Sequence, residues 1–223
     1  NKNKNDNKNK LSKITNLNNL SFIYSNLGEY KKAIDTHIEV LNGFKSLPNL
    51  DKEVATAYNN LGYFYNKLSI KNGDKKLLND ALKNYRKGVE IYENIYKNNL
   101  INKNLINIYS NIGLLYSDLS DNFNAEYFLK KSLDYSENLR KTYPDFYFTS
   151  INNLAVHFTN NKKHSDAKFL FDRAQKFLNS NIFLKDRTKS IYTNYLNIAF
   201  NYYGLNDIKN ADFYWKKSNA LKI

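Results

Sequence analysis

Residues 107–132 read NIYSNIGLLYSDLSDNFNAEYFLKKS, and they contain a spacing of small and large side chains that recurs along the chain. The apolar–small pair Ile112-Gly113 begins thirteen residues before Ala125, and the large residue Leu129 follows that alanine by four. Side chains three and four residues apart share one face of a helix. The stretch therefore indicates two helices joined by a turn.

The same spacing occurs five times. The alanines are Ala33, Ala81, Ala125, Ala167 and Ala211. The apolar–small pairs are Leu20-Ser21, Leu61-Gly62, Ile112-Gly113, Leu154-Ala155 and Ile198-Ala199. The large residues four positions after each alanine are His37, Tyr85, Leu129, Phe171 and Trp215. The second repeat reaches its alanine only after seven extra residues, which lie within residues 68–80 and predict a longer second hairpin or turn.

Small residues at a helix crossing let two backbones approach, while large residues one turn away fill the neighbouring groove. The pattern predicts antiparallel helix pairs, and only 2 prolines and 7 glycines interrupt the 223 residues. Asp74, Asp121 and Asp207 are expected to cap second helices, because an aspartate side chain accepts hydrogen bonds from the first helical turn. The helices are expected at residues 11–27, 30–46, 51–70, 75–97, 102–119, 122–142, 146–160, 164–179, 187–204 and 208–222.

This arrangement resembles the tetratricopeptide repeat (TPR), and the resemblance covers residues 14–223. The alanines are 48, 44, 42 and 44 residues apart rather than about 34, which is similar to the long repeats of kinesin light chains and of bacterial peptide-sensing regulators. The resemblance implies an all-α, right-handed superhelical solenoid of five helix–turn–helix repeats. The TPR domain is expected over residues 11–223, and residues 1–10, rich in asparagine and lysine, are expected to be a tail or linker. The five repeats are expected at residues 11–46, 51–97, 102–142, 146–179 and 187–222.

The residue before each apolar–small pair is an asparagine in every repeat. These residues are Asn19, Asn60, Asn111, Asn153 and Asn197. The resemblance to the long-repeat families implies that the first helix of each repeat lines a concave groove. It also implies that asparagines at this position hold the backbone of an extended peptide. The chemistry agrees, because one uncharged carboxamide both donates and accepts hydrogen bonds and so can pair with a peptide unit.

Two further rows of residues are expected on the same face of the first helices. One turn before the asparagines lie Thr15, Thr56, Asn107, Thr149 and Thr193. Three residues after them lie Phe22, Tyr63, Leu114, Val156 and Phe200, which either supply pockets for ligand side chains or pack between repeats. Of these rows we assign to the candidate peptide site Thr56, Tyr63, Asn107, Thr149 and Phe200. Asparagine is abundant in this chain, so the alternative for the ladder is a tolerated polar residue on a solvated face.

The net charge of +13 is dispersed rather than concentrated. Residues 1–10 hold four lysines and one aspartate, and residues 149–160 of a first helix hold no charged side chain. Lysines concentrate instead on second helices and turns, where they are expected to face solvent: Lys31, Lys32, Lys75, Lys76, Lys130, Lys131, Lys162, Lys163, Lys216 and Lys217. The groove is therefore expected to lack a clamp of basic residues for a terminal carboxylate. Nucleic-acid binding by the outer surface is a less favoured alternative.

No catalytic or metal site is expected. The chain has 0 Cys, which excludes disulfides and thiolate chemistry, and it has no Gly-rich phosphate loop and no histidine pair at the i, i+4 spacing of metal ligands. His37, His157 and His164 are assigned structural roles. We therefore expect no enzymatic activity, no cofactor and no metal.

The sequence predicts a protein–protein interaction module within a larger protein, with a peptide or protein segment as its partner. The alternative is a structural or oligomerisation scaffold, because the outer face of the last helix, including Phe213 and Tyr214, has no following helix to cover it. Self-association or docking within a longer chain would cover that face. No stretch approaches the ~20 apolar residues of a membrane span, and no leader is visible, so the default expectation is a cytoplasmic protein without membrane insertion.

Overall fold

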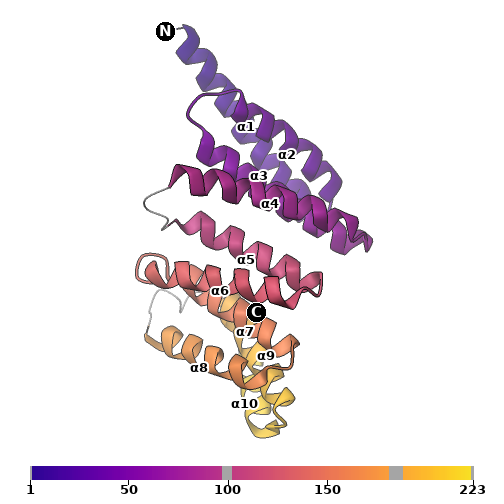
Figure 1. The fold of residues 1–223 in the computed structure, drawn as a ribbon, viewed down its shortest axis with the longest axis vertical. Coiled ribbons are helices and arrows are strands. Elements are labelled where there is room, and N and C mark those ends of the chain that lie inside the picture. Colours follow the sequence, from indigo (N-terminus) through magenta and orange to yellow (C-terminus); the bar gives the residue numbers. More distant parts are fainter. Residues whose placement is uncertain (1, 97–101, 181–187, 222–223) are drawn as a thin grey trace. The chain divides into compact units, whose positions relative to one another are not determined.

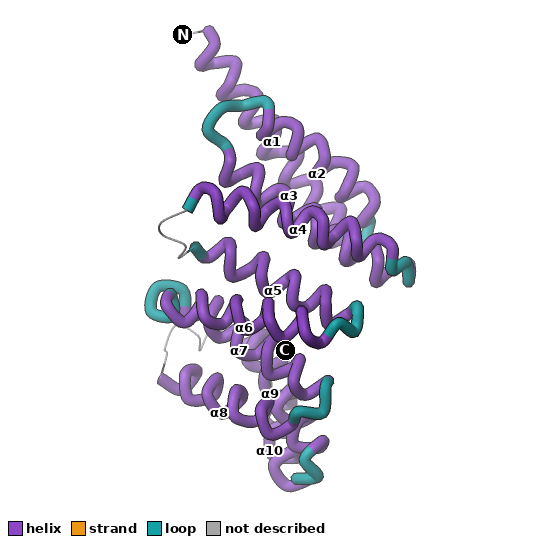
Figure 2. The backbone as a smooth tube through the Cα atoms, viewed as in Figure 1, coloured by secondary structure: helices purple, strands orange, loops and turns teal. Residues whose placement is uncertain are grey.

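The structure is a computed structural model that describes residues 2–96, 102–180 and 188–221. All regular secondary structure in these ranges is helical (Figure 1). The helices are α1 (Lys2–Asn26), α2 (Tyr30–Lys45), α3 (Asp51–Asn72), α4 (Lys76–Ile95), α5 (Lys103–Asp118), α6 (Asn122–Asn138), α7 (Pro144–Asn160), α8 (His164–Ser180), α9 (Thr188–Gly204) and α10 (Ile208–Asn219). The two helices of each repeat pair across a short turn (Figure 2), which confirms the predicted all-α fold of five helix–turn–helix repeats.

The chain divides into two compact units, Asn1–Leu100 and Ile101–Ile223. The first unit contains the two hairpins α1–α2 and α3–α4, with Ala33, Leu61 and Phe64 in its core. The second unit contains the other three hairpins. Its first helices are neighbours, because α5 packs against α7 and α7 packs against α9.

Paired helices cross at the small residues that the sequence pattern marks. A Cβ atom added to Gly62 would lie 2.6 Å from the ring of Tyr85, and one added to Gly113 would lie 2.6 Å from Leu129 Cγ. No side chain fits at either crossing without displacing its large neighbour. The recurring pairing of a small residue with a large one is therefore a direct contact between the two helices of a hairpin.

Each turn within a hairpin contains one residue with left-handed backbone geometry. These residues are Gly28 (φ 75°), Gly73 (φ 69°), Ser120 (φ 61°), Lys162 (φ 60°) and Asn206 (φ 59°). In four repeats this residue comes eight positions after the first residue of the apolar–small pair and five positions before the alanine. In the second repeat it comes twelve positions after the first residue of the pair and eight positions before the alanine. The seven extra residues therefore add about one helical turn to each helix of the second hairpin. This confirms the longer hairpin and leaves its turn short.

The expected capping aspartates lie at the starts of second helices. Asp121 and Asp207 cap α6 and α10, and each accepts a hydrogen bond of 3.1 Å from a backbone N–H three residues later. The donors are Asn124 and Asn210. Hydrogen bonds from their side chains, and to a smaller extent from their backbone N–H groups, lower the pKa of the Asp121 and Asp207 carboxyl groups. The expected cap at Asp74 is wrong, because the N-cap of α4 is Lys75. Asp74 lies one residue earlier and still accepts a hydrogen bond of 2.9 Å from the N–H of Lys76.

Two helix limits differ from the prediction. The expected start at residue 11 is wrong, because α1 begins at Lys2 and runs through the expected tail. No proline or glycine interrupts that segment, so backbone hydrogen bonding continues from the packed end of α1 toward its N-terminus. The side chains of residues 6–13 are exposed. The second difference is that α6 ends at Asn138 rather than at residue 142. The other described limits agree within two residues, and the expected limits at 97, 187 and 222 lie outside the described residues.

No helix in the described part of the chain is both long enough and apolar enough to cross a bilayer.

Candidate functional site

The predicted asparagine ladder lies on the first helices of the repeats, within reach of solvent. Asn19 is exposed, and the other four asparagines are half-buried. The row one turn earlier is exposed in every repeat. The first helices therefore share an accessible polar face in each unit, at the positions that the repeat predicts.

In the second unit, part of the predicted site gathers in a single cavity of about 260 Å³ between α7 and α9. The residues that line it are Phe148, Thr149, Asn152, Asn153, Lys189, Ser190, Thr193, Asn194 and Asn197. Asn153, Asn197 and Thr149 belong to the predicted site, and Thr193 belongs to the same row as Thr149. They meet because α7 and α9 are neighbouring first helices whose equivalent positions lie side by side. We call this cavity the carboxamide groove.

Asn153 is tied to the preceding repeat. Its Nδ2 donates a hydrogen bond of 2.7 Å to Ser110 Oγ on α5. This contact orients the carboxamide, and its Oδ1 is directed away from that bond. Asn153 therefore presents a fixed carboxamide to the groove rather than a mobile one.

A chain of amide hydrogen bonds underlies the groove and links three helices. Gln175 on α8 donates to Asn194 Oδ1, and Asn194 Nδ2 donates to Asn152 Oδ1. Asn152 Nδ2 donates in turn to the backbone carbonyl of Phe148, at 2.6 Å. Each hydrogen bond fixes whether the oxygen or the nitrogen of the next amide faces its partner. The network therefore sets the orientation of the Asn152 and Asn194 carboxamides.

Sequence reasoning missed Asn152 and Asn194. Asn194 is buried, and it occupies a position that is apolar or small and also buried in the three repeats before it: Ala57, Ile108 and Ser150. An asparagine at such a core position indicates an internal hydrogen-bond partner, because buried polar groups are almost always paired. That signal was present in the repeat alignment.

The groove also contains a charge that was not expected. Lys189, near the start of α9, is the charged residue among the nine described residues that line it. The expectation concerned a clamp of several basic residues for a terminal carboxylate, and one lysine does not form such a clamp. Lys189 lies in the first turn of α9, one turn before Thr193.

The predicted residues of the first unit lie on α1 and α3. Thr56 is exposed, but its Oγ1 lies 2.8 Å from the carbonyl oxygen of Lys52 and 2.6 Å from Tyr92 Oη on α4. Its hydroxyl therefore helps to join α3 to α4. Tyr63 is exposed, with the ammonium of Lys67 at 5.4 Å from its ring centroid.

The third row of residues divides between packing and exposure. The Phe22 ring contacts that of Phe64 at 5.4 Å between centroids, and Val156 packs against the core of the second unit. Phe200 is largely exposed on α9. In the second unit's α5, Asn107 and Leu114 are also exposed.

The basic outer surface is partly neutralised by neighbouring carboxylates. Nine of the ten lysines assigned to second helices and turns are exposed, and Lys131 is half-buried with its Nζ 4.3 Å from the Tyr109 ring centroid. Lys130 and Lys163 both pair with Glu126, at 2.7 and 2.8 Å, and their hydrogen bonds lower the pKa of that carboxyl.

The three histidines occupy contacts between helices. His37 and His157 each place Nδ1 2.9 Å from a serine hydroxyl of a first helix, and burial lowers the pKa of both, that of His37 to about 4. His164 Nδ1 lies 3.0 Å from Asn201 Oδ1. Within the described residues, no cluster of three or more histidine, aspartate or glutamate side chains is placed to hold a metal ion.

The chain has the fold of a helical-repeat domain, and one segment of it matches a known repeat family. A model of the tetratricopeptide repeat matches residues 14–37, which lie in the first hairpin. A comparison with curated protein sequences finds no match.

Solved structures share this fold along most of the chain. A putative kinesin light chain from Podosopora anserina with nearly identical TPR-like repeats has a TM-score of 0.71 at 14% identity, over 94% of this chain and 94% of that one. Aspartyl phosphate phosphatase F from Bacillus subtilis has a TM-score of 0.77 at 17% identity, over 98% of this chain and 53% of that one, so the chain spans about half of that protein. YrrB, described as a TPR protein with an unusual peptide-binding site, has a TM-score of 0.51 at 15% identity, over 92% and 84%. The expected likeness to kinesin light chains is confirmed at the level of the fold.

Proposed function

We propose that the chain is a protein–protein interaction module whose carboxamide groove binds an extended segment of a partner polypeptide. The observation that carries this proposal is the gathering of Asn152, Asn153, Asn194 and Asn197 in one cavity between α7 and α9. Asn152 and Asn194 pair with each other, with Gln175 and with the Phe148 carbonyl, so Asn153 and Asn197 are the carboxamides that contact the ligand in this proposal. Carboxamides supply both donors and acceptors, and an extended peptide offers both along its backbone. The fold supports the assignment, because stacked helical repeats create extended binding surfaces.

The fixed orientation of the groove amides favours binding. Asn153 is held by Ser110, and Asn152 is held by Asn194. Groups that are already ordered lose less conformational entropy when a ligand arrives. A few backbone hydrogen bonds of about 1 kcal/mol each, offset by the ordering of the ligand, correspond to a Kd in the micromolar range.

The predicted residues of the remaining first helices extend the proposal. Asn111 and Asn107 on α5 supply the same surface next to α7, and Phe200 on α9 supplies an apolar contact. In the first unit, Asn19, Asn60 and Tyr63 form the equivalent surface, while Thr56 contributes through its position beside Asn60. TPR proteins are typically binding scaffolds, and YrrB is described as having a peptide-binding site, which agrees with a binding rather than an enzymatic role.

A peptide-display selection followed by affinity measurement tests the proposal. Peptides enriched by the wild-type chain should lose at least about tenfold in affinity when Asn153→Ala and Asn197→Ala are combined, since each truncation removes about 1 kcal/mol of hydrogen bonding. Asn179→Ala, at an exposed position of α8, is the matched control and should bind as the wild type does. Thermal unfolding of each variant verifies that it is folded. If the double variant retained the enriched peptides at full affinity, the groove would not be the binding site.

Salt dependence separates this proposal from nucleic-acid binding. Affinity through uncharged carboxamides should change little between low and physiological salt. Binding to nucleic acid through the exposed lysines should fall steeply over the same range. A steep loss, together with full binding by the asparagine variants, would favour the nucleic-acid alternative.

A further inference from the structure

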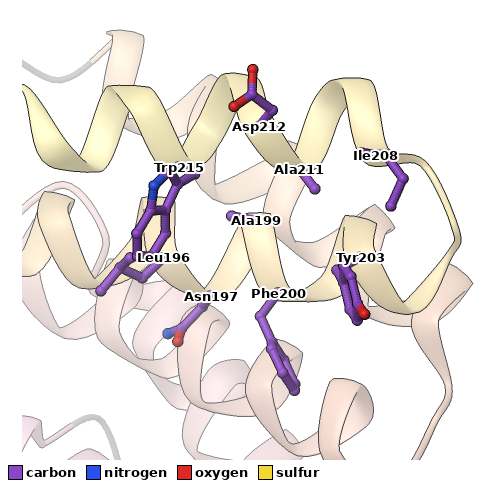
Figure 3. Close-up of a pocket in the computed structure, with 9 residues that line it drawn as sticks. All are labelled: Leu196, Asn197, Ala199, Phe200, Tyr203, Ile208, Ala211, Asp212 and Trp215. Atoms are coloured by element: carbon purple, nitrogen blue, oxygen red, sulfur yellow. The ribbon is translucent and has the colours of Figure 1, made fainter.

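A second, apolar groove lies on the outer side of the last hairpin. It has a volume of about 560 Å³ and is lined by Leu196, Asn197, Ala199, Phe200, Tyr203, Ile208, Ala211, Asp212 and Trp215. Figure 3 shows that these residues come from α9 and α10, with Ala199 and Ala211 facing each other between the two helices. Ile208 and Trp215 are 55% and 51% exposed, which is unusual for such large apolar side chains. We call this surface the tail groove.

The preceding hairpin shows what covers such a surface. The repeat aligns residues of the tail groove with residues 44 positions earlier, so that Tyr203 corresponds to Thr159 and Ile208 to His164. In the fourth repeat this surface is covered by the first helix of the fifth. Asn201 on α9 accepts a hydrogen bond of 3.1 Å from Thr159 and lies 3.0 Å from His164 Nδ1.

On α3, α7 and α9, one repeat position makes this contact with the repeat before it. On α3 it is Phe64, whose ring lies 5.3 Å from that of His37, and on α7 it is His157, which lies 2.9 Å from Ser117. The residues at this position in the second to fifth repeats are Phe64, Leu115, His157 and Asn201, and all are at most 3% exposed.

In α1 the same position is Ile23, which is 54% exposed. Its neighbour Leu20 is 37% exposed, whereas the residues aligned with Leu20 in the other repeats are at most 3% exposed: Leu61, Ile112, Leu154 and Ile198. Leu27, one turn further along α1, is also exposed. The outer side of α1 thus carries the side chains that normally pack on a preceding repeat. We call Leu20, Ile23 and Leu27 the head stripe.

The chemistry of the head stripe matches that of the tail groove. Inside the chain, polar Asn201 meets polar Thr159 and His164. At the ends, both partners are apolar, because Ile23 replaces the asparagine and Tyr203 and Ile208 replace the threonine and the histidine. A helix with an isoleucine at this position would bury it against Ile208, Trp215 and the ring of Tyr203, and isoleucine itself brings no polar side-chain group that needs a partner.

From this match we infer that the head stripe of one copy of the chain docks in the tail groove of a second copy. The contact repeats the packing of α9 on the α7–α8 hairpin. It is heterologous, joining different surfaces of the two copies, so each copy keeps one surface for the next and the copies join into a closed ring or an open filament. The tail groove shares Asn197 with the carboxamide groove. The inference does not rest on peptide binding, and it is tested at Ile23 and Ile208, which lie outside the carboxamide groove.

Sedimentation velocity of the 223-residue chain over a range of concentrations tests the inference. The wild type should show a mean mass that rises with concentration. Ile23→Asp and Ile208→Asp should each weaken association by at least about tenfold, because each buries a carboxylate in an apolar contact. Both positions are more than half exposed, so neither change disturbs the fold of the single chain. Phe123→Asp, at an exposed position of α6 outside both surfaces, is the matched control and should associate as the wild type does.

Mixing the two variants tests the direction of the contact. Ile23→Asp keeps an intact tail groove, and Ile208→Asp keeps an intact head stripe, so an equimolar mixture should form dimers that cannot grow further. Association should persist as salt is raised, because apolar contacts are not screened. A wild type that stays monomeric at every concentration would overturn the inference, as would a mixture that forms no dimer.

Discussion

The helix crossings of the first and third repeats occupy the same repeat positions with opposite chemistry. In the third repeat, Gly113 meets Leu129, and the contact is apolar and closely packed. In the first repeat, Ser21 meets His37, and a hydrogen bond of 2.9 Å joins their side chains although His37 is completely buried. The comparison teaches that the repeat fixes the sizes of the two residues and the distance between the helices. It does not fix whether the contact is apolar or polar.

The two crossings should therefore fail under different conditions. The apolar crossing depends on the space above the glycine, so it is sensitive to added volume. The polar crossing depends on a neutral imidazole, so it is sensitive to pH. Three predictions, from the largest expected effect to the smallest, separate these behaviours.

Gly113→Val should destabilise the chain by on the order of 3 kcal/mol, because even a single Cβ at this position would lie 2.6 Å from Leu129 Cγ and 3.0 Å from its backbone nitrogen. Equilibrium denaturation in urea measures the loss. Leu129→Ala in the same chain should recover part of it, since the smaller side chain makes room for the valine. Losses that simply add in the double variant would show that the two residues do not share the contact.

Lowering the pH should weaken the first crossing. Burial lowers the pKa of His37 to about 4, and the nearby Ala57 carbonyl opposes this only in part. The unfolded chain binds the proton near pH 6.5, so the stabilisation is present above about pH 6.5 and is lost as the pH falls toward 4. The loss should be on the order of 2 to 3 kcal/mol. Burial also lowers the pKa of His157, which adds a smaller loss in the same direction.

A double variant that copies the third repeat into the first is the control for this effect. Ser21→Gly combined with His37→Leu replaces the polar crossing by the apolar one. Urea denaturation at pH 7 and pH 4.5 should show a flatter pH dependence than in the wild type, with the part due to His157 remaining. An unchanged pH dependence would assign the effect to other groups.

The smallest effect is expected in the turns of the same two repeats. The left-handed residue is Gly28 in the first and Ser120 in the third, with φ values of 75° and 61°. Ser120→Gly should stabilise the chain by about 0.5 kcal/mol, because glycine adopts this backbone geometry without the cost that a Cβ imposes. Gly28→Ser should destabilise it by a similar amount, and thermal unfolding of both variants measures the pair. Changes of the same sign in both would contradict the backbone explanation.

Most of the fold could be predicted from the sequence, because small–large spacing reports directly on helix crossings. The spacing located all five hairpins and the seven-residue insertion of the second. It could not locate the start of α1, since residues 1–10 contain no helix breaker and the side chains of residues 6–10 are exposed. Composition described that segment as solvated, and the side chains of residues 6–10 are exposed, but composition does not determine backbone hydrogen bonding.

The candidate site could be predicted in part. The repeat placed Asn153, Asn197 and Thr149 on one face, and they line one cavity. It could not foresee that Asn194 would enter the same cavity from a core position, because this depends on Gln175 of another helix. Trp215 was expected at a packing position, yet it is half-exposed, because no further helix lies against it among the described residues.

By itself, the sequence determined the class of fold, the hairpin order and the polar face of the first helices, because these follow from periodicities within about 45 residues of chain. Only the tertiary structure decided which side chains share a cavity and which orientation each carboxamide takes. Those features depend on contacts between different repeats, such as Ser110 with Asn153 and Asn152 with Asn194. Asn201 on α9 and Ile23 on α1 occupy the same repeat position, yet Asn201 is buried and Ile23 is exposed. The burial of that position is therefore set by the neighbouring helix rather than by the residue itself.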